Sequence, residues 1–66
     1  MRIELNGEPF DCADGTTLAE LAAMRGLKPE RVAAERNGAL VRRADFTSTA
    51  LAEGDRVEIV HFVGGG

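Results

Sequence analysis

The sequence predicts an α+β domain in which a mixed sheet of four to five strands carries one main helix across it. Apolar and polar residues alternate at the two ends of the chain, whereas residues 18–25 show helical spacing. The last alternating stretch, 56–63, is apolar on its Val57 side and on both sides from Val60 onward, which is typical of a central strand. Such a strand would pair beside the first one, and a mixed sheet results.

A β-hairpin is predicted at the start of the chain. Residues 1–5 alternate, and Asn6-Gly7 follows, the pair that a type I′ turn favours because both central residues need positive φ. Residues 8–12 form the returning strand. Pro9 cannot donate a hydrogen bond to a sheet, so this strand is expected near an edge or to begin at Pro9.

One helix of two to three turns is predicted over residues 18–25. Thr17 and Glu20 have capping-box spacing, in which each side chain satisfies a backbone N–H of the first turn. Gly26 is placed to take the left-handed conformation that ends many helices. The apolar face of this helix consists of Leu18, Leu21 and Ala22.

A second hairpin is predicted near the middle of the chain. Residues 28–30 break the helical pattern and make at most one helical turn. Residues 32–36 then form a modest strand, Asn37-Gly38 repeats the type I′ signal, and 39–41 form a short partner strand.

The remaining segment connects this hairpin to the last strand. Residues 44–51 show no clear alternation, and we expect an irregular crossing in which Phe46 and Leu51 reach the core. The resulting order of elements is that of the β-grasp, or ubiquitin-like, architecture. We therefore expect one domain over 1–63 and a flexible glycine tail at 64–66.

Composition excludes several classes of function. A chain of 66 residues has little capacity for a deep catalytic pocket, which favours a binding module, a carrier or a subunit over an autonomous enzyme. The net charge of -3, the lack of Trp and Tyr and a single adjacent basic pair, Arg42-Arg43, argue against nucleic-acid binding. One cysteine, Cys12, allows neither a disulfide framework nor a Cys/His zinc cluster. No apolar run is long enough for a membrane span, and we expect a soluble, cytoplasmic protein.

The whole chain resembles the ThiS family of sulfur carrier proteins in thiamine biosynthesis. The resemblance lies in the order and spacing of several short motifs, and its most specific part is the last strand with its terminal glycines. The matching stretches are Asn6-Gly7, Asp14-Gly15-Thr16-Thr17-Leu18, Arg36-Asn37-Gly38, Leu51-Ala52-Glu53-Gly54-Asp55-Arg56-Val57 and His61-Phe62-Val63-Gly64-Gly65-Gly66.

This resemblance implies a covalent carrier and not an enzyme. A ubiquitin-activating-like adenylyltransferase of the ThiF type would use ATP to adenylate the carboxylate of Gly66, with no cofactor held permanently by the carrier. Sulfur from a persulfide donor would then leave a thiocarboxylate, which a thiazole synthase of the ThiG type consumes. A sibling carrier for molybdopterin or tRNA thiolation, or a non-covalent interaction module, is the alternative.

The candidate site is the end of the chain. Glycine lacks Cβ, so Gly64 and Gly65 suit a tail that threads a narrow channel, and Gly66 offers an open carbonyl to a nucleophile. The alternative is a frayed terminus without function. An apolar partner-binding surface is expected where the last strand leaves the domain, at Val60, Phe62 and Val63, although Val60 could equally belong to the core.

Other reactive residues have ordinary structural interpretations. Cys12 alternates with Phe10 and is expected to face the core rather than carry a persulfide. His61 is expected at the surface, and Asp14 in a turn. The remaining charged residues are expected on the surface, some of them close enough to the exit strand to assist docking: Arg42, Arg43, Glu53, Asp55 and Glu58.

Overall fold

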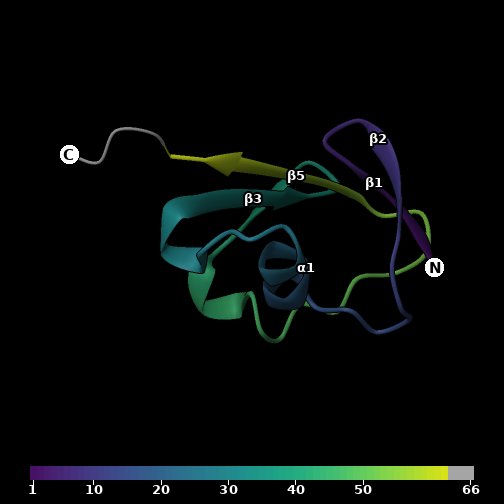
Figure 1. Cartoon of the computed structure of the whole chain (residues 1–66), viewed down its shortest axis with the longest axis horizontal. Coiled ribbons are helices and arrows are strands. Elements are labelled where there is room, and N and C mark those ends of the chain that lie inside the picture. Colours follow the sequence, from purple (N-terminus) through teal and green to yellow (C-terminus); the bar gives the residue numbers. More distant parts are fainter. Residues whose placement is uncertain (63–66) are drawn as a thin grey trace.

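The computed structural model describes residues 1–62, in which five strands form one sheet with an α-helix across it (Figure 1). The sheet order is β2-β1-β5-β3-β4; β1 and β5 are parallel, and the other neighbours are antiparallel. The predicted mixed sheet with a central last strand is therefore confirmed. The elements are β1 (Arg2–Leu5), β2 (Glu8–Asp11), α1 (Leu18–Met24), η1 (Pro29–Arg31), β3 (Val32–Arg36), β4 (Ala39–Val41), η2 (Arg43–Asp45) and β5 (Arg56–His61).

Both Asn-Gly pairs form the turns that the sequence predicts. Asn6 and Gly7 have φ of 50° and 84°, and Asn37 and Gly38 have φ of 53° and 85°. Positive φ at both central residues is the signature of the type I′ turn, whose twist matches that of the strands it joins. Each hairpin register is fixed by its turn.

The backbone N–H groups at the start of α1 find acceptors both in the capping box and in the crossing segment. Thr17 Oγ1 accepts the N–H of Glu20 at 3.1 Å, and Glu20 Oε1 accepts the N–H of Thr17 at 2.8 Å, which confirms the capping box. The two preceding N–H groups of the first turn have no partner within a helix. Here the crossing segment supplies their acceptors. The N–H of Leu18 donates to the carbonyl of Thr49 at 2.9 Å, and the N–H of Ala19 donates to the carbonyl of Phe46 at 3.0 Å.

The end of α1 is a Schellman motif. Gly26 has φ of 71°, its N–H donates to the carbonyl of Ala23 at 2.9 Å, and the N–H of Leu27 donates to that of Ala22 at 2.9 Å. The helix ends at Met24, one residue before the predicted end, and Arg25 is its C-cap.

The core lies between α1 and one face of the sheet, and Figure 1 shows the helix against that face only. Phe46 and Leu51 of the crossing segment close it from the side, as predicted, and are 2% and 4% exposed. The buried hydrophobic cluster comprises Ile3, Leu5, Leu18, Leu21, Val32, Ala34, Phe46, Leu51, Val57 and Ile59.

Two phenylalanines with opposite environments test this description of the core. Phe46→Ala removes a ring that is 2% exposed, and we expect it to lower the free energy of unfolding by about 3–5 kcal/mol. Phe62→Ala removes a ring that is 51% exposed and should cost less than about 0.5 kcal/mol. Urea unfolding of both variants measures the difference; similar losses would show that the core is placed wrongly.

Candidate functional site

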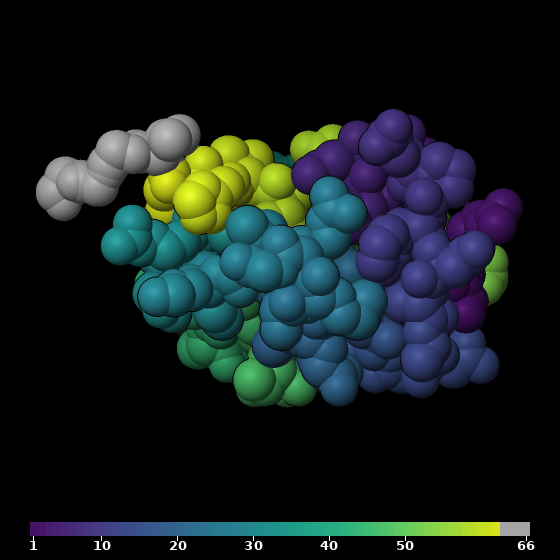
Figure 2. Space-filling model, viewed as in Figure 1, coloured from purple at the N-terminus to yellow at the C-terminus, as the bar shows by residue number. Residues whose placement is uncertain are grey.

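The site is built on β5, the strand that precedes the predicted tail. On one side β5 pairs with β3 from Val57, opposite Arg36, to His61, opposite Val32. On the other side β1 pairs only with its beginning, at Arg56 and Val57. The second half of β5 is therefore held by one neighbouring strand, and it reaches the surface at the end of the molecule away from the N-terminus (Figure 2).

Two asparagine side chains extend the hold on β5. Asn6 Oδ1 accepts the N–H of Ile59 at 2.8 Å, and its Nδ2 donates to the carbonyl of Ile59 at 3.3 Å. Asn37 Oδ1 accepts the N–H of Arg56 at 2.8 Å. The sequence indicated these residues only as turn formers; their bonds to β5 depend on a neighbour far along the chain.

Asp55 fixes the beginning of β5 and corrects a prediction. It was expected on the surface, but it is 7% exposed. Its carboxylate accepts hydrogen bonds from Arg36 Nε at 2.8 Å, Asn37 Nδ2 at 3.0 Å and the N–H of Ala52 at 2.8 Å. The surface interpretation was wrong because a carboxylate with this many donors can be buried, and two of those donors, Arg36 and Asn37, lie 19 and 18 residues away in the sequence.

The pKa of Asp55 reflects this arrangement. Burial of the carboxyl raises this pKa. The hydrogen bonds from Ala52, Asn37 and Arg36, together with the Arg36 charge, lower it by more than burial raises it, so the pKa lies below the ordinary value of 3.8. The side chain is therefore ionised at neutral pH and has a structural role.

The outer face of the sheet carries exposed apolar side chains near the end of β5. Val60 is 60% exposed and Phe62 is 51% exposed, so neither belongs to the core. The interpretation of Val60 as a core residue is wrong: apolarity on both sides of β5 does not reflect burial on both faces. Leu40 on β4 is 70% exposed and was not predicted. The alternation of Leu40 with Val41, which packs against the core, could have indicated it.

The other predicted site residues fall into two groups. Val63, Gly64, Gly65 and Gly66 lie outside the described residues. His61 is exposed, as expected, and Cys12 is partly buried against the core just after β2 ends. Within residues 1–62 no group of three or more His, Cys, Asp and Glu side chains is arranged to hold a metal ion.

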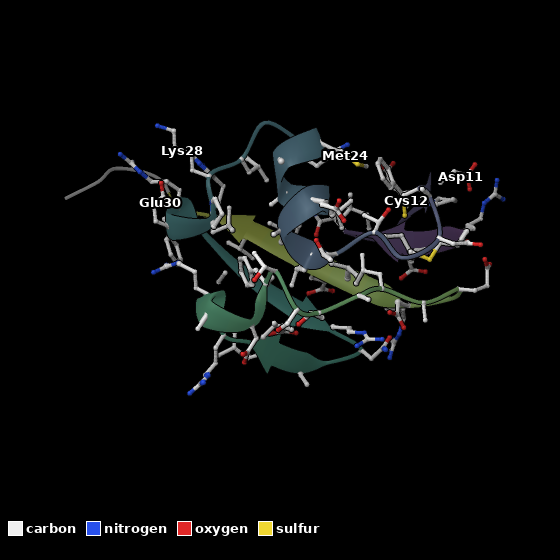
Figure 3. The ribbon with its side chains drawn as sticks, turned by 90° about the horizontal axis from the view of Figure 1, so that it is seen from below. Asp11, Cys12, Met24, Lys28 and Glu30 are labelled. Atoms are coloured by element: carbon white, nitrogen blue, oxygen red, sulfur yellow. The ribbon has the colours of Figure 1, made fainter. Side chains whose placement is uncertain are left out.

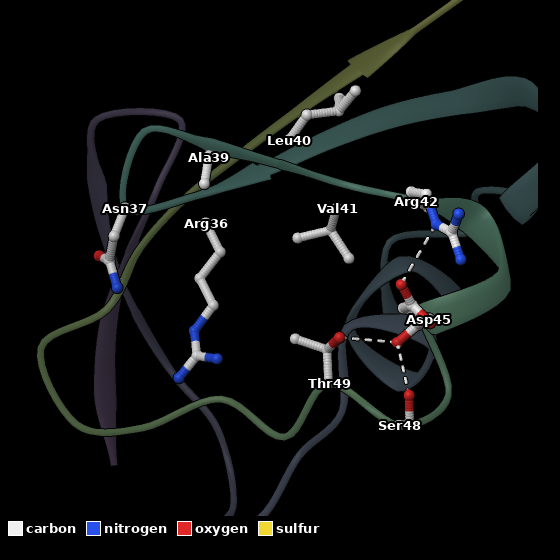
Figure 4. A pocket seen from close by; sticks show the side chains of 9 residues that line it. All are labelled: Arg36, Asn37, Ala39, Leu40, Val41, Arg42, Asp45, Ser48 and Thr49. Atoms are coloured by element: carbon white, nitrogen blue, oxygen red, sulfur yellow. Dashed lines mark hydrogen bonds and ion pairs between the residues drawn. The ribbon is translucent and has the colours of Figure 1, made fainter.

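A hollow of about 580 Å³ lies between β4 and the segment after η2 (Figure 4). Its polar groups are largely engaged with one another or with the fold. Arg42 Nε lies 3.6 Å from Asp45 Oδ2, and the hydroxyls of Ser48 and Thr49 donate to the carbonyl of Asp45 at 3.2 and 2.6 Å. Arg36 is bonded to Asp55. The hollow offers no nucleophile paired with a base.

Comparison with known proteins finds matches that extend over nearly the whole chain. The model of the ThiS family matches residues 3–66. Over 66 residues the chain is 50% identical to a thiazole synthase of Magnetococcus marinus, covering 100% of the chain but only 20% of that relative. Over 65 residues it is 35% identical to the sulfur carrier protein ThiS of Bacillus subtilis, covering 97% of the chain and 98% of the relative.

Solved structures show the same fold. The crystal structure of the thiamine biosynthesis protein ThiS from Geobacter metallireducens matches with a TM-score of 0.82 at 35% identity, and the match covers 100% of each chain.

In the part of the chain that the structure describes, no helix is long and apolar enough to cross a membrane.

The depressed pKa of Asp55 makes a prediction about acid stability. An acid whose pKa is lower in the folded chain contributes stability that is complete above its unfolded pKa and is lost as the pH falls through the folded one. Asp55→Asn should therefore lower the free energy of unfolding by about 1–3 kcal/mol at neutral pH. The difference from wild type should shrink as the pH drops below the ordinary value of 3.8.

Urea unfolding at a series of pH values measures this difference. Glu8→Gln, at an exposed position on β2, is the control and should match wild type throughout. A difference between Asp55→Asn and wild type that stays constant into acid would contradict a charge-dependent role for Asp55.

Proposed function

Because the chain belongs to the ThiS family, we propose that it is a sulfur carrier of thiamine biosynthesis that works through the carboxylate of Gly66. The match of the family model over residues 3–66, which includes the glycine end, carries this proposal. The Bacillus subtilis and Geobacter metallireducens relatives, of nearly the same length, support it.

The chemistry at Gly66 begins with activation. A terminal carboxylate has a pKa of roughly 3.3–3.7 and is ionised at neutral pH, so it is a poor electrophile. Its oxygen attacks the α-phosphorus of ATP on a ThiF-type adenylyltransferase, and pyrophosphate leaves. The terminal sulfur of a persulfide donor then attacks the acyl carbon, and AMP leaves with the oxygen. A thiolate then attacks the donor's own sulfur in the acyl disulfide: a new disulfide forms between the thiol and the donor, and the S–S bond to the acyl-bound sulfur breaks, which releases the thiocarboxylate.

The acceptor we propose is a thiazole synthase of the ThiG type. The Magnetococcus marinus relative is itself called a thiazole synthase, and this chain corresponds to about a fifth of its length. Because a region similar to this chain lies within a protein called a thiazole synthase, we infer that the carrier and the synthase contact each other directly. The folded domain would be the part that each partner recognises, and catalysis would belong to the partners.

The proposal is tested by the intact mass of the chain after incubation with ATP, the adenylyltransferase and a persulfide source. We expect a mass increase equal to the exchange of one oxygen for one sulfur, mapped to Gly66. The chain lacking Gly66 should stay unmodified and melt at the wild-type temperature. If the wild-type chain stays unmodified, the alternative of a non-covalent interaction module remains. If the sulfur is transferred to a molybdopterin or tRNA pathway instead, the chain is a sibling carrier.

The exposed apolar residues at the end of β5 supply a second test. Val60→Asp places a charge in the proposed docking surface and should lower kcat/KM for adenylation roughly tenfold or more, because a carboxylate buried in an interface without a partner is costly. Met24→Asp is the matched control: Met24 is 53% exposed, on the helix (Figure 3). Pyrophosphate release measures both variants, and equal losses would place the docking surface elsewhere.

A further inference from the structure

The end of the domain at which β5 finishes is built from the two 3₁₀ turns. The N–H of Phe62 donates to the carbonyl of Arg31 at 2.8 Å, which joins η1 to the residue just after β5. Arg43 donates from Nε to the carbonyl of Pro29 at 3.0 Å and from Nη2 to that of Glu30 at 3.4 Å, which joins η2 to η1. The teal turn η1 therefore lies beside the last residue that the structure describes, and the green turn η2 lies against η1 at the same end of the molecule (Figure 1).

This end carries a concentration of positive charge. Its four exposed cations, the basic end face, are Lys28, Arg31, Arg42 and Arg43. Residues 28–31 and 42–45 hold these four cations and two carboxylates, so they carry a net charge of +2 in a chain whose net charge is -3. Figure 3 places Lys28 and Glu30 at the end of the molecule opposite Asp11.

Two of these cations are not used by the described part of the fold. Within residues 1–62 the side chains of Lys28 and Arg31 make neither an ion pair nor a hydrogen bond. Arg43 is occupied in joining the turns, and Arg42 is 3.6 Å from Asp45 (Figure 4). Binding a partner through Lys28 and Arg31 would therefore break no side-chain ion pair or hydrogen bond within residues 1–62.

We propose that the basic end face docks on an acidic rim of thiazole synthase, around the entrance that receives the tail. The inference rests on the function proposed above. A positive end on a negatively charged domain orients the encounter with a partner before contact, so that the end bearing the tail leads. A protein carboxylate surface fits better than nucleic acid, because the rest of the chain is acidic and has no Trp or Tyr for stacking.

The association rate constant of the chain with the thiazole synthase of the same genome tests the inference. Lys28→Gln combined with Arg31→Gln should slow association about three- to tenfold at low salt and weaken its salt dependence. Arg2→Gln combined with Arg25→Gln is the matched control. It removes the same charge near β2, where Arg2 pairs with Asp11 at 2.9 Å and Arg25 lies 6.0 Å from the Phe10 ring centre.

A third variant should act in the opposite direction. Glu30→Gln removes a carboxylate from the same end and should speed association. The melting temperature of each variant shows whether a change in association rate comes from a loss of folding rather than from a change in binding. Equal slowing in the two double variants, or no slowing in either, overturns the inference, and so does a wild-type chain that does not bind the synthase. The intact mass of the chain tests the carrier function separately. If the thiocarboxylate forms at Gly66 but the association rate does not depend on these charges, the proposed function stands and the inference about docking is wrong.

Discussion

The sheet depends on the insertion of β5 between β1 and β3. The order β2-β1-β5-β3-β4 means that the two hairpins are joined in the sheet only through this last strand. A two-stranded hairpin is at best marginally stable in water, and several strands over a hydrophobic face are needed for independent stability. Val57 and Ile59 supply the apolar contacts of β5, the side chains of Asn6 and Asn37 bond to its backbone, and Asp55 in turn accepts a hydrogen bond from Asn37. The strand that leads to the tail is thus also the strand that closes the domain.

This arrangement separates two tasks between the faces of one strand. The inward face of β5 is buried against α1 and the crossing segment, and it fixes the position of the strand. The outward face ends in Val60 and Phe62, which remain exposed and contribute little to the core. A substitution at Val60 or Phe62 would therefore leave the buried contacts that hold β5 in the sheet in place.

The buried carboxylate of Asp55 connects the two halves of the chain. It receives donors from the end of β3, from the turn after it and from the loop before β5. Such a network holds several segments in one relative position, because a buried polar group left without partners is costly. Asp55 therefore sets where β5 begins, and the register with β3 sets where it ends.

The sequence by itself determined most of the local structure. Asn-Gly pairs fix type I′ turns through their need for positive φ, and Thr17, Glu20 and Gly26 fix the two ends of α1 through nearby backbone groups. The central position of β5 also followed from its composition. All of these depend on neighbours within a few residues or on the character of one strand.

Only the tertiary structure decided that Asp55 is buried and that Val60 is exposed. Asp55 is internal because Arg36 and Asn37 converge on it, and Val60 is exposed because a single helix covers only one face of the sheet. The bonds from Asn6 to Ile59 and the basic end face beside Phe62 likewise join segments distant in the chain. The environments of Asp55, Asn6 and the basic end face depend on which distant segments meet, and the local pattern around each residue does not contain that information.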